Sequence, residues 1–132
     1  MEITVTKMNG RVPVDVIHIE GKLDSSSYGT FKAKAKEMIN EGTRYILLDL
    51  TKTTYISSAG LSALQAIFTD LRALDTNVTE EAIHKEIAAG TYKSPHLKLV
   101  NLSKEVHDVI KMSGFDMFIE ISPDLITAVN SF

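Results

Sequence analysis

The stretch Tyr45-Ile46-Leu47-Leu48-Asp49-Leu50 is a short and nearly continuous apolar run. Such a run is typical of a β-strand that helices cover on one or both faces. A segment rich in Thr and Ser follows over 51–58, and apolar side chains then recur at helical spacing, at Leu61, Leu64, Ile67, Phe68 and Leu71. This unit predicts a central parallel strand, a polar loop, and a helix that begins at Ser57 or Ser58.

On the N-terminal side of this unit, the sequence predicts a β-hairpin and a first helix. Polar and apolar residues alternate over 2–6 and again over 12–19, on either side of the turn signal Asn9-Gly10. A polar loop over 21–27 leads into a helical stripe, and that helix ends near 40–42. The stripe consists of Phe31, Ala35, Met38 and Ile39.

On the C-terminal side, the pattern predicts a strand at 96–100, a helix that ends at Gly114, a last strand at 117–121 and a short closing helix at 125–129. Strands that alternate with helices indicate an α/β fold with right-handed crossovers. We therefore expect a mostly parallel mixed sheet of four to five strands with an antiparallel first strand. About four helices should cover it.

The chain length of 132 residues predicts a single domain over 1–132. The segment 75–95 is long for a connection inside a compact domain, so we interpret it as an insertion between the second helix and the fourth strand. Asn77 with Glu80, and Gly90 at the end, predict a short helix over 79–89 in this segment. Its apolar side chains, Val78, Ile83 and Ile87, would pack on the domain or on a partner.

The composition excludes several classes of protein. Cysteine is absent, which rules out disulfides, thiolate metal sites and a cysteine nucleophile. The net charge of −3 argues against nucleic-acid binding. The first residues lack the features of a secretory signal, and no apolar stretch approaches the roughly 18 residues of a membrane span. We expect a cytoplasmic protein, without cofactor or metal, that is a monomer or a weak dimer.

Functional residues in such a sheet lie beyond the carboxyl ends of the parallel strands. Three polar loops should meet there, at 24–27, 49–58 and 101–103. The second loop places Ser58 at the start of a helix. One interpretation is that Ser58 is an N-cap, which is worth about 1 kcal/mol. The other is that its hydroxyl accepts a phosphoryl group, since a helix N-terminus favours an anion.

These motifs resemble the STAS domain of bacterial anti-sigma factor antagonists. The resemblance rests on the stretch 47–51 leading to Tyr55-Ile56-Ser57-Ser58-Ala59-Gly60-Leu61, on Gly21-Lys22-Leu23-Asp24, and on 100–103 together with 113–115. It covers nearly the whole chain except 75–95. STAS domains also occur in anion transporters, stress complexes and lipid-transport systems, so the motifs are more specific for the family than for one role.

The resemblance implies a binding protein rather than an enzyme. Its members bind an anti-sigma factor serine kinase and so release a sigma factor, and phosphorylation by that kinase ends the interaction until a PP2C-type phosphatase resets it. By this resemblance Ser58 is the phosphorylated residue, with Ser57 as the second choice. Ser57 stands where better-known members carry Asp, and Ala59 where they carry Ser or Thr. The implied partner-binding residues are Asp24, Ser25, Tyr55, Ser57, Ser58, Ala59, Gly60, Leu61 and Ser62.

Other interpretations stay open at this point. Asp24 is either an N-cap or a partner contact, Asp49 should tie down the loop that follows it, and Leu61 is as compatible with the core as with the surface. An accessory subunit of a lipid-transport or stress-signalling complex would share the same fold. A serine hydrolase fits poorly, because Ile56 stands where the nucleophile elbow needs glycine and no histidine is placed as a base.

Overall fold

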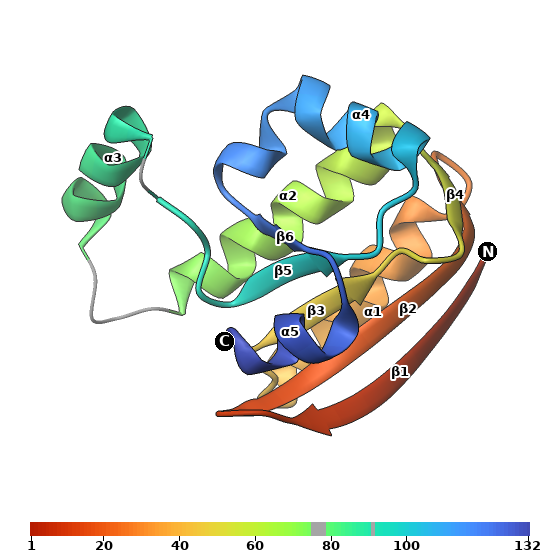
Figure 1. Cartoon of the computed structure of the whole chain (residues 1–132), viewed down its shortest axis with the longest axis horizontal. Coiled ribbons are helices and arrows are strands. Elements are labelled where there is room, and N and C mark those ends of the chain that lie inside the picture. The colour runs from red at the N-terminus through yellow and green to blue at the C-terminus, as the bar shows by residue number, and fades with distance from the viewer. Residues whose placement is uncertain (75–78, 91) are drawn as a thin grey trace.

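The computed structural model describes residues 1–74, 79–90 and 92–132. Six strands form the sheet: β1 (Glu2–Asn9), β2 (Pro13–Leu23), β3 (Ile46–Asp49), β4 (Thr53–Ile56), β5 (Leu97–Val100) and β6 (Glu120–Ser122). The helices are α1 (Tyr28–Asn40), α2 (Ser58–Ala73), α3 (Glu80–Ala89), α4 (Lys104–Ser113) and α5 (Leu125–Asn130), with a 3₁₀ turn, η1, at Phe115–Met117. Figure 1 shows this arrangement.

The strand order is β1-β2-β3-β5-β6, with β4 beside the end of β2. The β1–β2 hairpin is antiparallel, and all the other pairs are parallel. The α/β class, the antiparallel first strand and the short inserted helix after the second helix are therefore confirmed. The five strands of the main path agree with the predicted sheet, and β4 is an addition to it.

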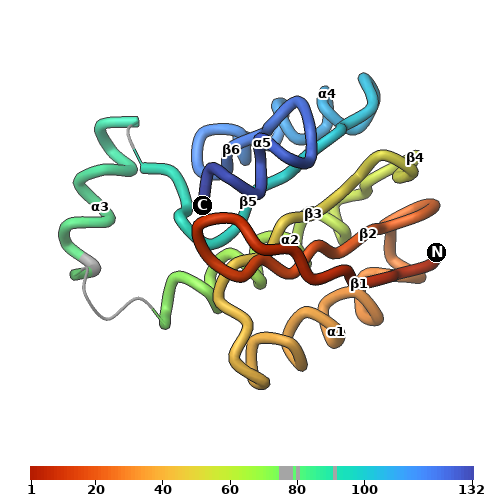
Figure 2. Tube along the Cα trace, turned by 60° about the horizontal axis from the view of Figure 1, so that its bottom comes forward, coloured from red at the N-terminus to blue at the C-terminus, as the bar shows by residue number. Residues whose placement is uncertain are grey.

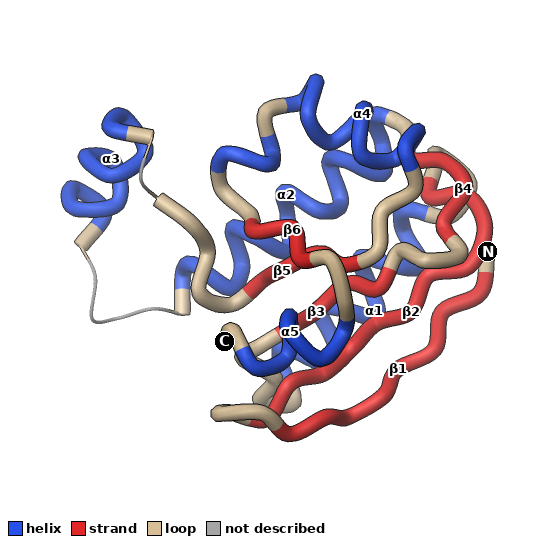
Figure 3. Tube along the Cα trace, viewed as in Figure 1, coloured by secondary structure: helices blue, strands red, loops and turns tan. Residues whose placement is uncertain are grey.

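The structure corrects two element boundaries. The segment interpreted as a polar loop contains β4, because β2 continues past Ile19 to Leu23 and offers a partner edge. Thr53 is buried there, and its hydroxyl donates to the carbonyl of Ile19 at 2.8 Å. The last strand begins at Glu120 rather than Met117, because the chain after Gly114 first makes a 3₁₀ turn. Figure 3 shows β4 beside the far end of β2.

Two apolar clusters lie on the two faces of the sheet. The larger cluster joins the sheet to α1, α2 and α4, and the smaller joins it to α5. Along β2, Ile17 and Ile19 face the first cluster and Val14 and Val16 the second, as alternation in a strand requires. Figure 2 shows α1 and α5 on opposite sides of β2 and β3. Because α5 is short, part of the second face stays uncovered.

The helix predicted over 79–89 is confirmed as α3. Thr79 caps it by accepting from the amide of Ala82 at 3.1 Å, and Gly90 ends it in the left-handed conformation. Figures 1 and 2 show α3 standing to one side of the sheet. Ile83 is nevertheless buried in the larger cluster, with Ile87 partly buried against it, so the helix packs on the domain. Val78 and Asn77, which also entered the prediction, lie outside the described residues.

Candidate functional site

The site around Ser58 is built by the junction of β2, β4 and α2. Leu23 pairs with Ile56 at the end of the β2–β4 ladder. The amide of Ser57 then donates to the carbonyl of Leu23 at 3.0 Å. The helix start is thus fixed directly to the strand that precedes the Asp24 loop, so two loops that are far apart in sequence lie together.

Gly60 allows this close approach. A Cβ at position 60 would lie 2.5 Å from the carbonyl oxygen of Leu23 and 3.0 Å from side-chain atoms of Ile56 and Leu23. Real Cβ atoms do not approach a carbonyl oxygen that closely. Gly60 is buried, so it allows the helix start to pack against Leu23 and is not itself exposed to a partner.

The two serines have different roles in the local structure. Ser57 is the N-cap of α2: its backbone is extended, and its hydroxyl oxygen accepts from the amide of Gly60 at 3.3 Å. Ser58 is the first residue of the helix and is exposed. The capping interpretation therefore belongs to Ser57 and is wrong for Ser58, since the residue that caps a helix precedes its first turn.

The Asp24 loop is held by its own serines. The carboxylate of Asp24 accepts from the amide and hydroxyl of Ser26 at 3.0 and 2.6 Å, and its backbone carbonyl accepts from the amides of Ser27 and Tyr28. The side-chain hydrogen bond from Ser26 is the main reason that the pKa of Asp24 lies below its usual value. Asp24 is therefore a negatively charged turn residue at neutral pH and is not the cap of α1, whose N-cap residue is Ser27.

The predicted partner-binding residues are mostly exposed or half-buried at this edge. Ser25, Ser58, Ser62 and Tyr55 are exposed, and Asp24, Ser57, Ala59 and Leu61 are half-buried. Leu61 also packs against the larger apolar cluster.

Sequence reasoning missed Tyr28. This side chain is 40% exposed at the first position of α1, and its amide is bonded to the Asp24 loop. Tyr55 on β4 is 44% exposed. Exposed tyrosines are enriched among the residues that dominate protein interfaces. An aromatic residue directly after the Asp24-Ser25-Ser26-Ser27 turn was the available signal.

The third polar loop serves local structure. Ser103 caps α4 by accepting from the amide of Val106 at 3.3 Å, and Asn101 adopts a positive φ of 60°. Asp49 ties down the next loop as expected, because its carboxylate accepts from the amide of Thr51 at 3.1 Å. The structure adds a hydrogen bond from Nδ1 of His18 to Asp49, at 2.7 Å.

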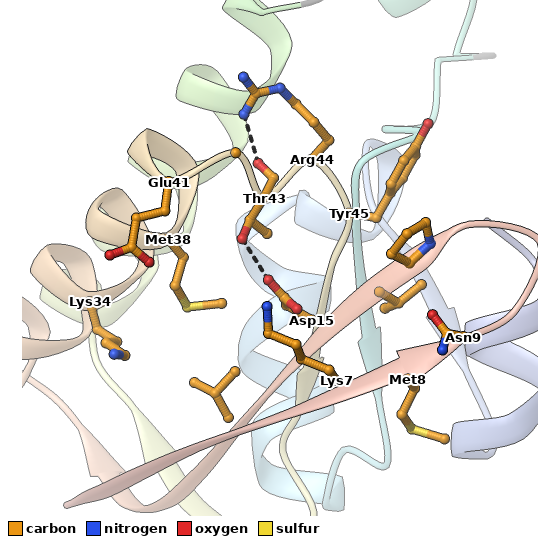
Figure 4. Close-up of a pocket in the computed structure, with 14 residues that line it drawn as sticks. Lys7, Met8, Asn9, Asp15, Lys34, Met38, Glu41, Thr43, Arg44 and Tyr45 are labelled. Carbon is orange, nitrogen blue, oxygen red and sulfur yellow. Dashed lines mark hydrogen bonds between the residues drawn. The ribbon is translucent and has the colours of Figure 1, made fainter.

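A hollow of about 690 Å³ lies elsewhere, between β1 and α1 near the start of β3. Figure 4 shows Asp15 near its centre, accepting from the Thr43 hydroxyl at 2.5 Å, with Lys7 and Lys34 at its walls. None of the predicted partner-binding residues lines it. In the described parts of the chain, no group of three or more His, Cys, Asp or Glu side chains is placed to hold a metal ion.

Comparison with known proteins points to one family. A family model described as "STAS domain" matches residues 6–93. A Bordetella bronchiseptica protein named "Putative anti-sigma factor antagonist BtrV" is 25% identical over 115 residues, which cover 87% of this chain and 80% of that protein.

Two solved structures share the fold. An anti-sigma factor antagonist from Mycobacterium paratuberculosis superposes with a TM-score of 0.71 at 16% sequence identity. The match covers 98% of this chain and 93% of the chain of that antagonist. The Bacillus cell fate determinant SpoIIAA in its phosphorylated form has a TM-score of 0.60 at 17% identity, covering 93% of both chains. At these identities the likeness shows a shared fold.

Proposed function

We propose that this chain, which belongs to the STAS domain family, is an anti-sigma factor antagonist controlled by phosphorylation of Ser58. In the unphosphorylated state it binds an anti-sigma factor that is also a serine kinase, and so releases a sigma factor. The similarity to BtrV and to the solved antagonists supports this role. The phosphorylated form of SpoIIAA supports a phosphoryl switch on this fold.

The observation that carries the proposal is the exposure of Ser58 at the start of α2. Ser57 performs the capping, so Ser58 is free to be modified without loss of the cap. The first turn of α2 contains no acidic residue, and a helix N-terminus tolerates negative charge. A phosphoryl group would therefore leave the free protein folded.

The same group would oppose binding. Phosphorylation adds a charge of roughly −1.5 to −2. Binding a partner would remove water from this charge beside the ionised Asp24, and this desolvation costs free energy. Asp24 lies at the same edge, and its lowered pKa keeps it charged near neutrality. We propose that Asp24, Ser25, Tyr55, Ser57, Ala59, Leu61 and Ser62 surround Ser58 in the interface, with Tyr28 added to them.

The cycle then needs a kinase, a phosphatase and a shared compartment. The anti-sigma factor kinase phosphorylates Ser58, and a PP2C-type phosphatase removes the phosphate and restores binding. The kinase reaction draws on the ATP of the cytoplasm, where we place the protein, and the phosphatase hydrolyses the phosphorylated protein with water in the same compartment. Among the described helices, none is long and apolar enough to cross a membrane.

The test begins with the partner. Affinity purification should recover a small histidine-kinase-like ATPase, and incubation with that protein and ATP should place one phosphate on Ser58, as mapped by mass spectrometry. Ser58→Ala should abolish the modification, whereas Thr69→Ala, at an exposed hydroxyl of the same helix outside the proposed interface, should retain it. Recovery of a membrane ATPase complex, or phosphate on Ser57 alone, would contradict the proposal.

A further inference from the structure

Three polar side chains form a hydrogen-bonded chain across β1, β2 and β3. Nδ1 of His18 lies 2.7 Å from Oδ2 of Asp49, and Nε2 of the same ring lies 3.0 Å from the hydroxyl oxygen of Thr6. The sheet register produces the arrangement, since His18 pairs with Asp49 in β3 and with Thr4 in β1, two residues from Thr6. Sequence reasoning assigned none of these residues to chemistry.

The direction of the hydrogen bonds follows from the carboxylate. Partial burial alone would raise the pKa of Asp49, but hydrogen bonds from Thr51 and His18 outweigh it and hold the pKa below its usual value. An ionised carboxylate only accepts hydrogen bonds, so Nδ1 of His18 carries the proton. In the neutral ring the lone pair is then on Nε2, and the hydroxyl of Thr6 donates to it.

The three hydrogen-bonded side chains are accessible to solvent. His18 lies on the face of the sheet that α5 covers only in part, with 31% of its side chain exposed, and Thr6 is exposed. A hollow of about 350 Å³ lies over the three residues, and Lys52 also lines it. A small molecule can therefore reach the Thr6 hydroxyl.

A carboxylate that orients an imidazole, which in turn accepts from a hydroxyl, is the arrangement that activates a hydroxyl as a nucleophile. We propose that Thr6 is an acyl-accepting residue that Asp49 and His18 activate towards small activated esters. This inference is independent of Ser58, because the two sites share no residue.

The reaction balances with the ester alone. Oγ1 of Thr6 attacks the carbonyl carbon while its proton passes to Nε2 of His18. The bond from that carbon to the leaving oxygen then breaks, and the imidazolium returns the proton to the departing oxygen. The products are an acyl ester on Thr6 and the free alcohol. Water can hydrolyse the ester by the same proton transfers.

The experiment uses p-nitrophenyl acetate with the full chain. Acetylation is mapped by fragmenting the tryptic peptide that contains residues 1–7, because both Thr4 and Thr6 lie in it and lysines also react with this ester. A positioned general base contributes about 10²- to 10⁴-fold. We expect Thr6 to be the acetylated threonine, and His18→Gln to slow its acetylation by at least about 10²-fold.

Two further variants make the result decisive. Asp49→Asn keeps the shape of the side chain but no longer fixes the tautomer, so it should also slow acetylation of Thr6. Thr54→Val is the control, since Thr54 is an exposed strand threonine outside this hollow and its loss should leave acetylation of Thr6 unchanged. If Thr6 reacts no faster than Thr4, or at the same rate in His18→Gln and Asp49→Asn, the hydrogen-bonded chain only holds the strands together and the proposal is wrong.

Discussion

Replacement of Gly60 by alanine tests how the start of α2 is held against β2. The new Cβ would lie 2.5 Å from the backbone oxygen of Leu23, and a carbonyl in a strand ladder cannot rotate away as a side chain can. Overpacking of this kind costs typically about 1–3 kcal/mol, and a backbone obstacle places the cost near the upper end. Alanine returns about 1 kcal/mol through its higher helix propensity. We therefore expect a net loss of about 2 kcal/mol in the free energy of unfolding.

Urea denaturation followed by circular dichroism measures this loss as a lower midpoint at an unchanged slope. Gly29→Ala is the matched control, because Gly29 is also in the first turn of a helix and nothing lies within 4 Å of its added Cβ. That variant should be as stable as the wild type or more stable. If Gly60→Ala is also as stable as the wild type, the close approach of α2 to Leu23 is not what fixes the position of Ser58.

Three other predictions test separate parts of the structure. Asp49→Asn should cost about 1.5–3 kcal/mol at pH 7, because the ionised carboxylate accepts from Thr51 and His18. The pKa of Asp49 is lower in the folded protein than in the unfolded chain, so this stability is present above the unfolded pKa and is lost as the pH falls through the folded pKa. The denaturation midpoints of variant and wild type should therefore converge in acid. A difference between the two midpoints that stays constant from pH 7 to acid would contradict this. Lys98→Met should lower the free energy of unfolding by about 1–3 kcal/mol and reduce the hydrogen-exchange protection of α5. The reason is that the buried Lys98 ammonium donates to the carbonyl and the hydroxyl of Ser131 at 2.9 and 2.8 Å. Unchanged protection of α5 would refute this role. Because Ile83 of α3 is buried in the core, Ile83→Ala should lower the free energy of unfolding by about 2–5 kcal/mol. Lys85→Ala, on the exposed side of the same helix, should leave it almost unchanged. Equal stability of the two variants would show that α3 does not pack on the domain.

The elements that sequence predicted well are those whose pattern is local. The apolar run at 45–50 and the helical stripe from Leu61 to Leu71 each carry their own period, so β3 and α2 were found. Gly114 and Gly90 ended their helices as predicted, because a left-handed residue favours glycine wherever the helix lies.

The elements that sequence missed depend on contacts between distant segments. The four residues of β4 form a strand only because β2 extends to Leu23 and offers a partner, which the pattern of 51–58 does not reveal. The bonds of His18 to Asp49 and Thr6 depend on the register of three strands. Gly60 stood among the predicted partner-binding residues, and only the structure shows that the carbonyl oxygen of Leu23 in the same chain lies where its Cβ would be.

The sequence predicted where the loops of Asp24 and Ser58 lie better than it predicted the role of each serine. Polar loops after parallel strands meet at one edge of a sheet, so Asp24 and Ser58 could be placed together from the sequence. Which of two adjacent serines caps the helix depends on a single peptide orientation, and the structure assigns that role to Ser57.

The most direct test of the switch is the affinity of Ser58→Asp for the anti-sigma factor kinase, measured by isothermal titration calorimetry beside Ser58→Ala. Thr69→Asp is the charge control, since Thr69 is an exposed residue of the same helix outside the proposed interface. We expect Ser58→Ala and Thr69→Asp to bind about as tightly as the wild type, and Ser58→Asp at least tenfold more weakly, a loss of about 1.4 kcal/mol or more. Equal affinity of Ser58→Asp and Ser58→Ala would contradict control of binding by negative charge at Ser58.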